Sequence, residues 1–104
     1  MSKNLIENRC FLDLILTTSR DQALSLLHTI TKEQLLLISE ISYNILHLPL
    51  PKKAKYYVSR KKKLFERLAS RTLSRTKKLT LIKKNAKHIL QLLWSLKQKF
   101  SELQ

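Results

Sequence analysis

Apolar residues recur at intervals of three and four along most of the chain, which is the spacing of an amphipathic α-helix. In the first half, three segments open with a polar residue followed three positions later by Glu or Gln. This capping-box pattern marks a helix start. The three pairs are Asn4 with Glu7, Ser19 with Gln22, and Thr31 with Gln34. They predict helices over residues 4–16, from Ser19 to about residue 28, and over residues 32–48.

The third predicted helix has the widest apolar arc. The residues that mark its polar side are Glu33, Ser39, Glu40 and Ser42. A helix that is apolar around most of its surface is typical of the buried centre of a bundle. Pro49 and Pro51 end it, because proline cannot continue a helix and forces its preceding residue into an extended conformation.

The next predicted helix covers residues 51–70, with Pro51 as its first helical residue. Lys61 falls on its apolar face, so we expect the aliphatic part of this side chain to pack there while its ammonium group reaches water. The apolar face comprises Ala54, Tyr57, Val58, Leu64, Phe65, Leu68 and Ala69.

Ser74 is a good N-cap for a last helix, which carries an apolar stripe of heptad spacing. Asn85 leaves open whether this segment forms one helix or two, since Asn tolerates left-handed backbone and also caps helices. The stripe comprises Leu79, Ile82, Ala86, Ile89, Leu93, Leu96, Phe100 and Leu103.

Composition supports an all-α fold. The 104 residues include no Gly and two Pro, and β-branched residues show no sustained alternation of period two. We therefore expect residues 1–104 to form one helical domain, a compact bundle of about five helices.

Charge is distributed very unevenly between the two halves. Residues 1–48 carry four Lys/Arg and five Asp/Glu, a formal charge of −1, whereas residues 49–104 carry 17 Lys/Arg and two Asp/Glu, a formal charge of +15. The first half is therefore interpreted as a near-neutral scaffold and the second as a basic contact surface.

Between Lys52 and Lys87 there are 15 basic residues and one acid, Glu66. Each pair of like charges one helical turn apart destabilises a helix. We therefore expect an anionic partner that neutralises these basic residues. Nucleic acid is the predicted partner, held by its phosphates, because Lys outnumbers Arg and base-reading Asn and Gln are scarce. The candidate contacts are Lys52, Lys53, Lys55, Arg60, Lys62, Lys63, Arg67, Arg71, Arg75, Lys77, Lys78, Lys83 and Lys84.

Aromatic residues leave two alternatives open. Tyr56 and Tyr57 could stack on unpaired bases or pack into the bundle. Trp94 fits the core or a partner interface better than a base platform.

Two other functions compete with nucleic-acid binding. In one, the apolar stripe docks a virion partner or a second copy through Leu79, Ile82, Ile89, Leu93, Leu96 and Phe100. In the other, the last helix lies on an anionic membrane with Trp94 and Phe100 inserted. We rank membrane action below the other two functions, because we expect this segment to be buried in the core of the bundle.

The chain contains few residues in patterns that are typical of a catalytic site. The second half offers only Glu66 and Glu102 as acids, and the absence of Gly excludes nucleotide-binding loops. His28, His47 and His88 have no neighbours at ligand spacing, and one cysteine cannot complete a zinc site. We expect no enzyme, no metal and no cofactor.

Cys10 is expected to be a small buried apolar residue. The first residues are too charged for a signal peptide, and residues 11–16 are too short for a membrane span. We expect an intracellular protein, located in the nucleus or a virion and not secreted.

Several of these segments together resemble small basic proteins encoded by Polinton (Maverick) DNA elements and adintovirus-like DNA viruses. The resemblance covers about residues 12–93. It lies in the order of Thr31 to Leu35, Asn44 to Leu46, Pro49-Leu50, the Lys-rich helix with Leu68-Ala69, and Leu73-Ser74 before Lys77 to Leu79.

This resemblance implies a DNA virus or virus-like element as the setting, and it implies no particular chemistry. Family members carry Gly-Gly after the last basic cluster, whereas this chain has Lys84-Asn85-Ala86 there. The resemblance therefore does not extend to processing at a Gly pair or to a membrane-active tail. The sequence predicts a packaging or condensing protein that binds nucleic acid without sequence preference.

Overall fold

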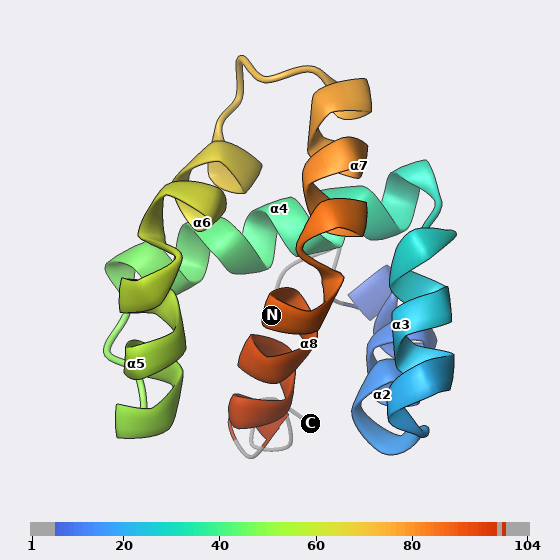
Figure 1. Cartoon of the computed structure of the whole chain (residues 1–104), viewed down its shortest axis with the longest axis horizontal. Coiled ribbons are helices and arrows are strands. Elements are labelled where there is room, and N and C mark those ends of the chain that lie inside the picture. Colours follow the sequence, from blue (N-terminus) through green and yellow to red (C-terminus); the bar gives the residue numbers. More distant parts are fainter. Residues whose placement is uncertain (1–5, 98, 100–104) are drawn as a thin grey trace.

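Three helices begin directly after the residues predicted to cap them, Ser19, Thr31 and Ser74. A computed structural model describes residues 6–97 and 99, and these form seven α-helices and no strand (Figure 1). The helices are α2 Arg9–Thr17, α3 Arg20–His28, α4 Lys32–His47, α5 Lys52–Arg60, α6 Lys62–Ala69, α7 Arg75–Lys84 and α8 Ala86–Ser95. The all-α prediction, with a strongly basic C-terminal half, is confirmed.

Three of the predicted caps form hydrogen bonds. The Thr31 N–H donates to Gln34 Oε1 at 2.9 Å and the Gln34 N–H donates to Thr31 Oγ1 at 3.2 Å, a complete capping box. Ser19 accepts from the Gln22 N–H at 3.3 Å, but the Gln22 side chain bonds the Thr18 hydroxyl. Ser74 Oγ accepts from the Lys77 N–H at 3.3 Å. Each bond satisfies a backbone donor that the first turn of a helix leaves unpaired.

The start of the first helix differs from the prediction. Asn4, its predicted cap, lies outside the described residues. Asn8 interrupts the predicted helix with φ −111° and ψ 23°, and α2 begins at Arg9. Asn is a poor residue for a helix interior, and this favours the break although its side chain makes no capping hydrogen bond to α2.

The described residues form seven helices instead of about five because two predicted helices are each divided. The predicted 51–70 helix breaks at Lys61, where φ is −130° and ψ is 38°. The last helix breaks at Asn85, where φ is −117° and ψ is 24°. The first break occurs where a charged residue interrupts the apolar face, and the second at a residue that tolerates non-helical backbone. Pro51 is the N-cap of α5, so this helix begins one residue later than predicted.

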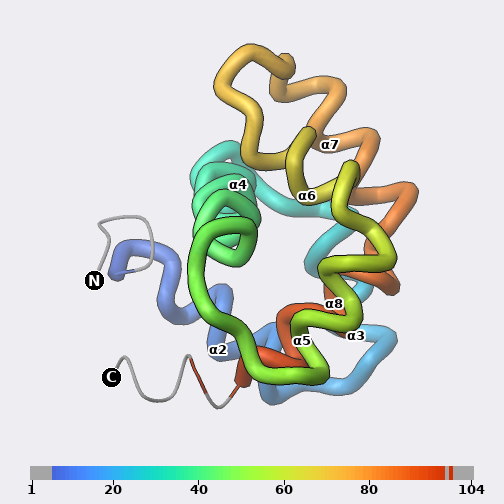
Figure 2. The backbone as a smooth tube through the Cα atoms, turned by 90° about the vertical axis from the view of Figure 1, so that its left-hand side faces the viewer, coloured from blue at the N-terminus to red at the C-terminus, as the bar shows by residue number. Residues whose placement is uncertain are grey.

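Each of the seven helices contributes buried residues to the core. α4 packs mainly on α6, while α8 packs on α5, α3 and α2. Figure 1 shows α5 and α6 on one side of α8, and α2 and α3 on the other. Figure 2 looks along α4 and shows α2 and α7 on opposite sides of it. Ile15, Leu27 and Leu68 have no exposed surface in this core.

The rotation of α4 about its axis differs from the prediction. Ser42, predicted on the polar side, is 2% exposed, and its hydroxyl donates to the Ile38 carbonyl at 2.8 Å. Leu36 and Tyr43 are 44% and 53% exposed instead. α4 is therefore not buried all round, because α6 and α7 cover only part of its circumference.

Cys10 was expected to be buried, but it is exposed. It precedes Phe11 and Leu12, which are buried, so the inward face of α2 starts one residue later. The 51–70 segment agrees better with the prediction, since its apolar face is buried or half-buried throughout.

Candidate nucleic-acid interface

The outer face of α5 presents four basic residues around one tyrosine. At 100° per residue, Tyr56 lies between Lys52 and Arg60 on the face opposite buried Ala54 and Val58. The Arg60 guanidinium carbon lies 5.6 Å from the centre of the Tyr56 ring, and its Nη1–H donates to Tyr56 Oη at 3.1 Å. The cation is therefore held over the ring. Lys52, Lys53, Lys55 and Arg60 are all exposed.

The two adjacent tyrosines differ in burial. Tyr56 is 55% exposed, whereas Tyr57 is half-buried against the core. Their ring centres lie 5.6 Å apart in an edge-to-face arrangement. Tyr57 therefore belongs to the bundle, and Tyr56 belongs to the basic surface.

α6 continues the basic surface of α5. Lys62, Lys63 and Arg67 are exposed on one side of this helix, while Phe65 and Leu68 on the other side are buried. Glu66 lies among these cations and is itself exposed. A short helix with this division is stabilised by its buried face and leaves the polar face available to a ligand.

α7 presents charge around most of its circumference. Ile82 is its buried residue, and Arg75, Lys77, Lys83 and Lys84 are exposed. Lys78 differs, because it is half-buried and its Nζ donates to Ser39 Oγ of α4 at 3.3 Å. Burial lowers the pKa of Lys78 from its ordinary value. A negatively charged neighbour would stabilise the protonated form of this half-buried amine.

None of the thirteen predicted contacts forms an ion pair with a carboxylate among the described residues. Twelve of them are exposed, and Lys78 is the half-buried exception. These residues lie on elements that contact one another, since α5 contacts α6 and α6 contacts α7. Because α7 has bases on several sides, Lys77, Lys83 and Lys84 do not all share a face with Lys78.

His88, on the first turn of α8, lies near the break between α5 and α6. Its pKa is lowered, mainly by burial and then by the positive charges of Lys61 and Arg60. The positive charges at the C-terminal end of α5 therefore act on a residue of α8.

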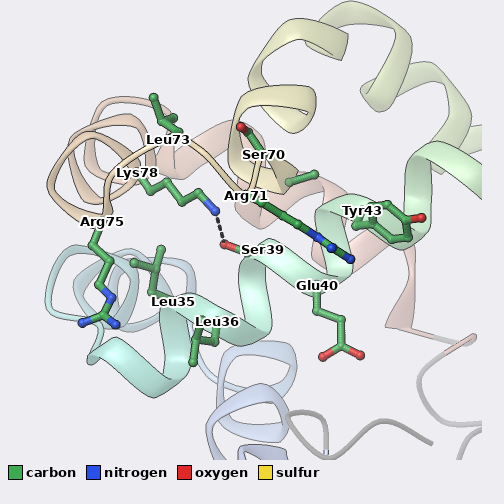
Figure 3. A pocket seen from close by; sticks show the side chains of 11 residues that line it. Leu35, Leu36, Ser39, Glu40, Tyr43, Ser70, Arg71, Leu73, Arg75 and Lys78 are labelled. Atoms are coloured by element: carbon green, nitrogen blue, oxygen red, sulfur yellow. Dashed lines mark hydrogen bonds between the residues drawn. The ribbon is translucent and has the colours of Figure 1, made fainter.

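A concave pocket of about 570 Å³ lies where α4, the end of α6, residues 70–74 and α7 meet. Figure 3 shows Lys78 extending from α7 toward Ser39, and Arg71 extending across α4 toward Tyr43. The Glu40 carboxylate points away from Lys78. This pocket combines cations with an exposed aromatic ring.

The apolar stripe of the last segment is used inside the fold. Ile82, Ile89, Leu93 and Leu96 are at most 3% exposed, and Leu79 is half-buried. Phe100 lies outside the described residues. Trp94 is half-buried, and its Nε1–H donates to the Ile15 carbonyl at 3.0 Å. The four buried residues cannot contact a partner or a bilayer without leaving the core.

Within the described part of the chain, no three His, Cys, Asp or Glu side chains gather closely enough to hold a metal ion. None of the helices formed by residues 6–97 and 99 is long and apolar enough to cross a membrane.

Sequence reasoning missed Tyr43. Its signal was the recurrence of Leu36, Tyr43 and His47 at intervals of seven and four on α4, which places the three on one side of the helix. The Tyr43 and His47 ring centres lie 4.6 Å apart.

Comparisons of the chain with protein-family models, with curated proteins and with solved structures found no match.

Proposed function

We propose that this protein binds nucleic acid without sequence preference, through phosphate contacts on α5, α6, residues 70–74 and α7. One observation carries the proposal: thirteen Lys and Arg side chains on adjoining elements, twelve of them exposed, have no carboxylate partner among the residues that the structure describes. Cations on a purely structural surface are usually interspersed with acids, which relieve their repulsion. Phosphates supply that relief here.

The mechanism is release of counterions. Each phosphate that a Lys or Arg neutralises frees cations condensed on the nucleic acid, so affinity falls as salt rises. About six contacts would give a slope of log K against log salt near −5. Lys side chains act as point charges, which suits phosphates better than base edges. The base sequence of the nucleic acid should therefore have little effect on the affinity.

The setting that we propose is the packaging or condensing of DNA in a virus-like element, in the nucleus or the virion. Support for this setting comes from the resemblance to proteins of Polinton elements, and the net charge of +14 suits neutralisation of DNA. The docking alternative gains no support, because four residues of its apolar stripe are at most 3% exposed. The membrane alternative needs Trp94, which is half-buried and donates a hydrogen bond to the Ile15 carbonyl.

The test is a binding assay titrated with salt, in which duplex DNA, single strands and anionic vesicles are compared side by side. We expect binding to both nucleic acids with a steep salt slope, and no leakage from the vesicles. Affinity that does not depend on salt, or tighter binding to vesicles than to either nucleic acid, would show that the basic surface has another role.

A further inference from the structure

A second pocket continues the one beneath Arg71 and Lys78. It is lined by Leu46, His47, Lys62 and Glu66, and it shares Tyr43, Ala69 and Ser70 with the first pocket. The two together form an open groove between α4 and α6, which we term the α4–α6 groove. From Leu36 to His47, α4 rises about 16 Å at about 1.5 Å per residue.

Tyr43 lies at the centre of this groove. It is 53% exposed and lines both pockets, whereas His47 lines only the second. The two rings are inclined by 51°, so His47 supports the tyrosine without covering it. An exposed ring supported in this way can stack on a planar group.

Cations lie at both ends of the groove. Arg71 and Lys78 come from the end formed by residues 70–74 and α7, where Arg71 reaches toward Tyr43 (Figure 3), and Lys62 lines the other pocket. Ser39 accepts a hydrogen bond from Lys78, which fixes the direction of this amine. Phosphates on either side of a stacked base would meet these cations.

We propose that the α4–α6 groove binds a short stretch of unpaired nucleotides, with one base stacked on Tyr43 and its flanking phosphates held by Arg71, Lys78 and Lys62. This inference rests on the proposed function and adds a subsite for single strands to it. Bases within a duplex stack on one another and expose only their edges, so the ring could contact a base face only in a single strand.

Two carboxylates, Glu40 and Glu66, also line the groove. They repel phosphates, which restricts the backbone to the cationic ends. Carboxylates can also accept hydrogen bonds from the amino groups of bases. An acidic peptide would satisfy the cations equally well, but it would meet the two glutamates and would offer no planar group to Tyr43. The exposed ring of Tyr43, which can stack on a base, therefore favours nucleotides over an acidic peptide.

The test compares a short oligothymidine with a duplex of equal length at the same salt concentration. Tyr43→Ala should weaken binding of the single strand about tenfold, the loss of one stacked base, and should leave duplex binding unchanged. Tyr43→Phe should retain the affinity of the parent. Tyr56→Ala, at a tyrosine of similar exposure outside the groove, should lose less.

Photo-crosslinking of 5-iodouracil in the oligomer to the unmodified protein is the independent measurement. We expect the crosslink on the peptide that contains Tyr43. Equal loss of duplex and single-strand binding in Tyr43→Ala would overturn the subsite, and so would no loss, or a crosslink only at Tyr56. In these cases the proposed function would stand. Failure of the parent protein to bind either nucleic acid would overturn both proposals.

A glutamate-rich peptide completes the experiment as a competitor. If it binds more tightly than the oligomer and with the same dependence on Tyr43, the groove accepts an acidic protein segment, and the nucleotide proposal is wrong. We expect it to bind more weakly than the oligomer.

Discussion

The indole N–H of Trp94 donates a hydrogen bond to the carbonyl oxygen of Ile15 at 3.0 Å, joining α8 to α2. Ile15 has no exposed surface, so this bond lies at the edge of the core. It fixes a residue from the end of the chain against one from its beginning. The sequence left open whether Trp94 belongs to the core or to a partner interface, and this bond places it at the core.

Trp94→Phe should therefore reduce the free energy of unfolding. Loss of the hydrogen bond costs about 1 kcal/mol, and the smaller ring leaves space beside α2. Urea denaturation followed by circular dichroism measures the change. Tyr43→Phe, which alters an exposed ring, is the control and should change stability by less than about 0.5 kcal/mol. Equal stability of the two variants would mean that the Trp94 contact does not stabilise the fold.

Truncation of the core should have a larger effect. Leu68 has no exposed surface and packs where α6 meets α4, so Leu68→Ala should cost about 2–5 kcal/mol. Leu48 is 55% exposed, so Leu48→Ala is the matched control and should cost little. Denaturation midpoints of the two variants decide the comparison. A small loss in Leu68→Ala would contradict the packing of α6 on α4.

The double variant Lys62→Ala, Lys63→Ala tests the basic surface. Both residues are exposed and form no ion pair with any described residue, so their replacement should preserve the fold. We expect the slope of log K against log salt to become less steep by about one to two units on every sequence. Anisotropy titrations at several salt concentrations measure it.

The matched control for this variant is Arg20→Ala, Lys32→Ala, which removes the same charge from the first residues of α3 and α4. Its slope should stay close to that of the parent. If both double variants flatten the slope equally, binding depends on net charge alone and not on the α5–α6 surface.

His88 should make stability depend on pH. Because burial and the charges of Lys61 and Arg60 lower its folded-state pKa, the unfolded chain binds this proton at higher pH than the folded chain. The contribution of His88 to stability is therefore complete above about pH 6.5 and is lost as pH falls through the folded-state pKa.

Melting temperatures at pH 7.5 and 5.5 measure this effect. His88→Gln cannot take up the proton, so its melting temperature should fall less between the two values than that of the parent. Identical falls would show that other groups cause the pH dependence.

Features set by neighbours in sequence could be predicted. Thr31 and Gln34 form their capping box because both partners lie within one turn. The apolar face of residues 51–70 was also predictable, since helical periodicity decides which side chains share a face. The break at Lys61 was not predictable, because the apolar pattern continues on both sides of it. It depends on how α5 meets α8 and how α6 meets α4.

Part of the candidate site could likewise be predicted from the sequence, and part could not. The thirteen basic residues are evident from the sequence, and the scarcity of acids among them, with Glu66 alone between Lys52 and Lys87, already predicts that few have a carboxylate partner. Tyr43 and the α4–α6 groove could not be predicted, because residues 43, 62 and 71 come together only when α6 and residues 70–74 pack beside α4. The exposure of Leu36 and the burial of Ser42 are likewise set by which sides of α4 its neighbours cover.

The separation of near-neutral and basic helices gives the molecule a large electric dipole moment. α2 and α3 lie on one side and α5 and α6 on the other, so the positive end of the dipole lies on the side of α5 and α6 (Figure 1). In the field of a polyanion this dipole experiences a torque that turns α5 and α6 toward the anion before contact. If the protein binds a polyanion as proposed, α2 and α3 would form an outer side of low charge, and this would reduce the repulsion between neighbouring bound molecules.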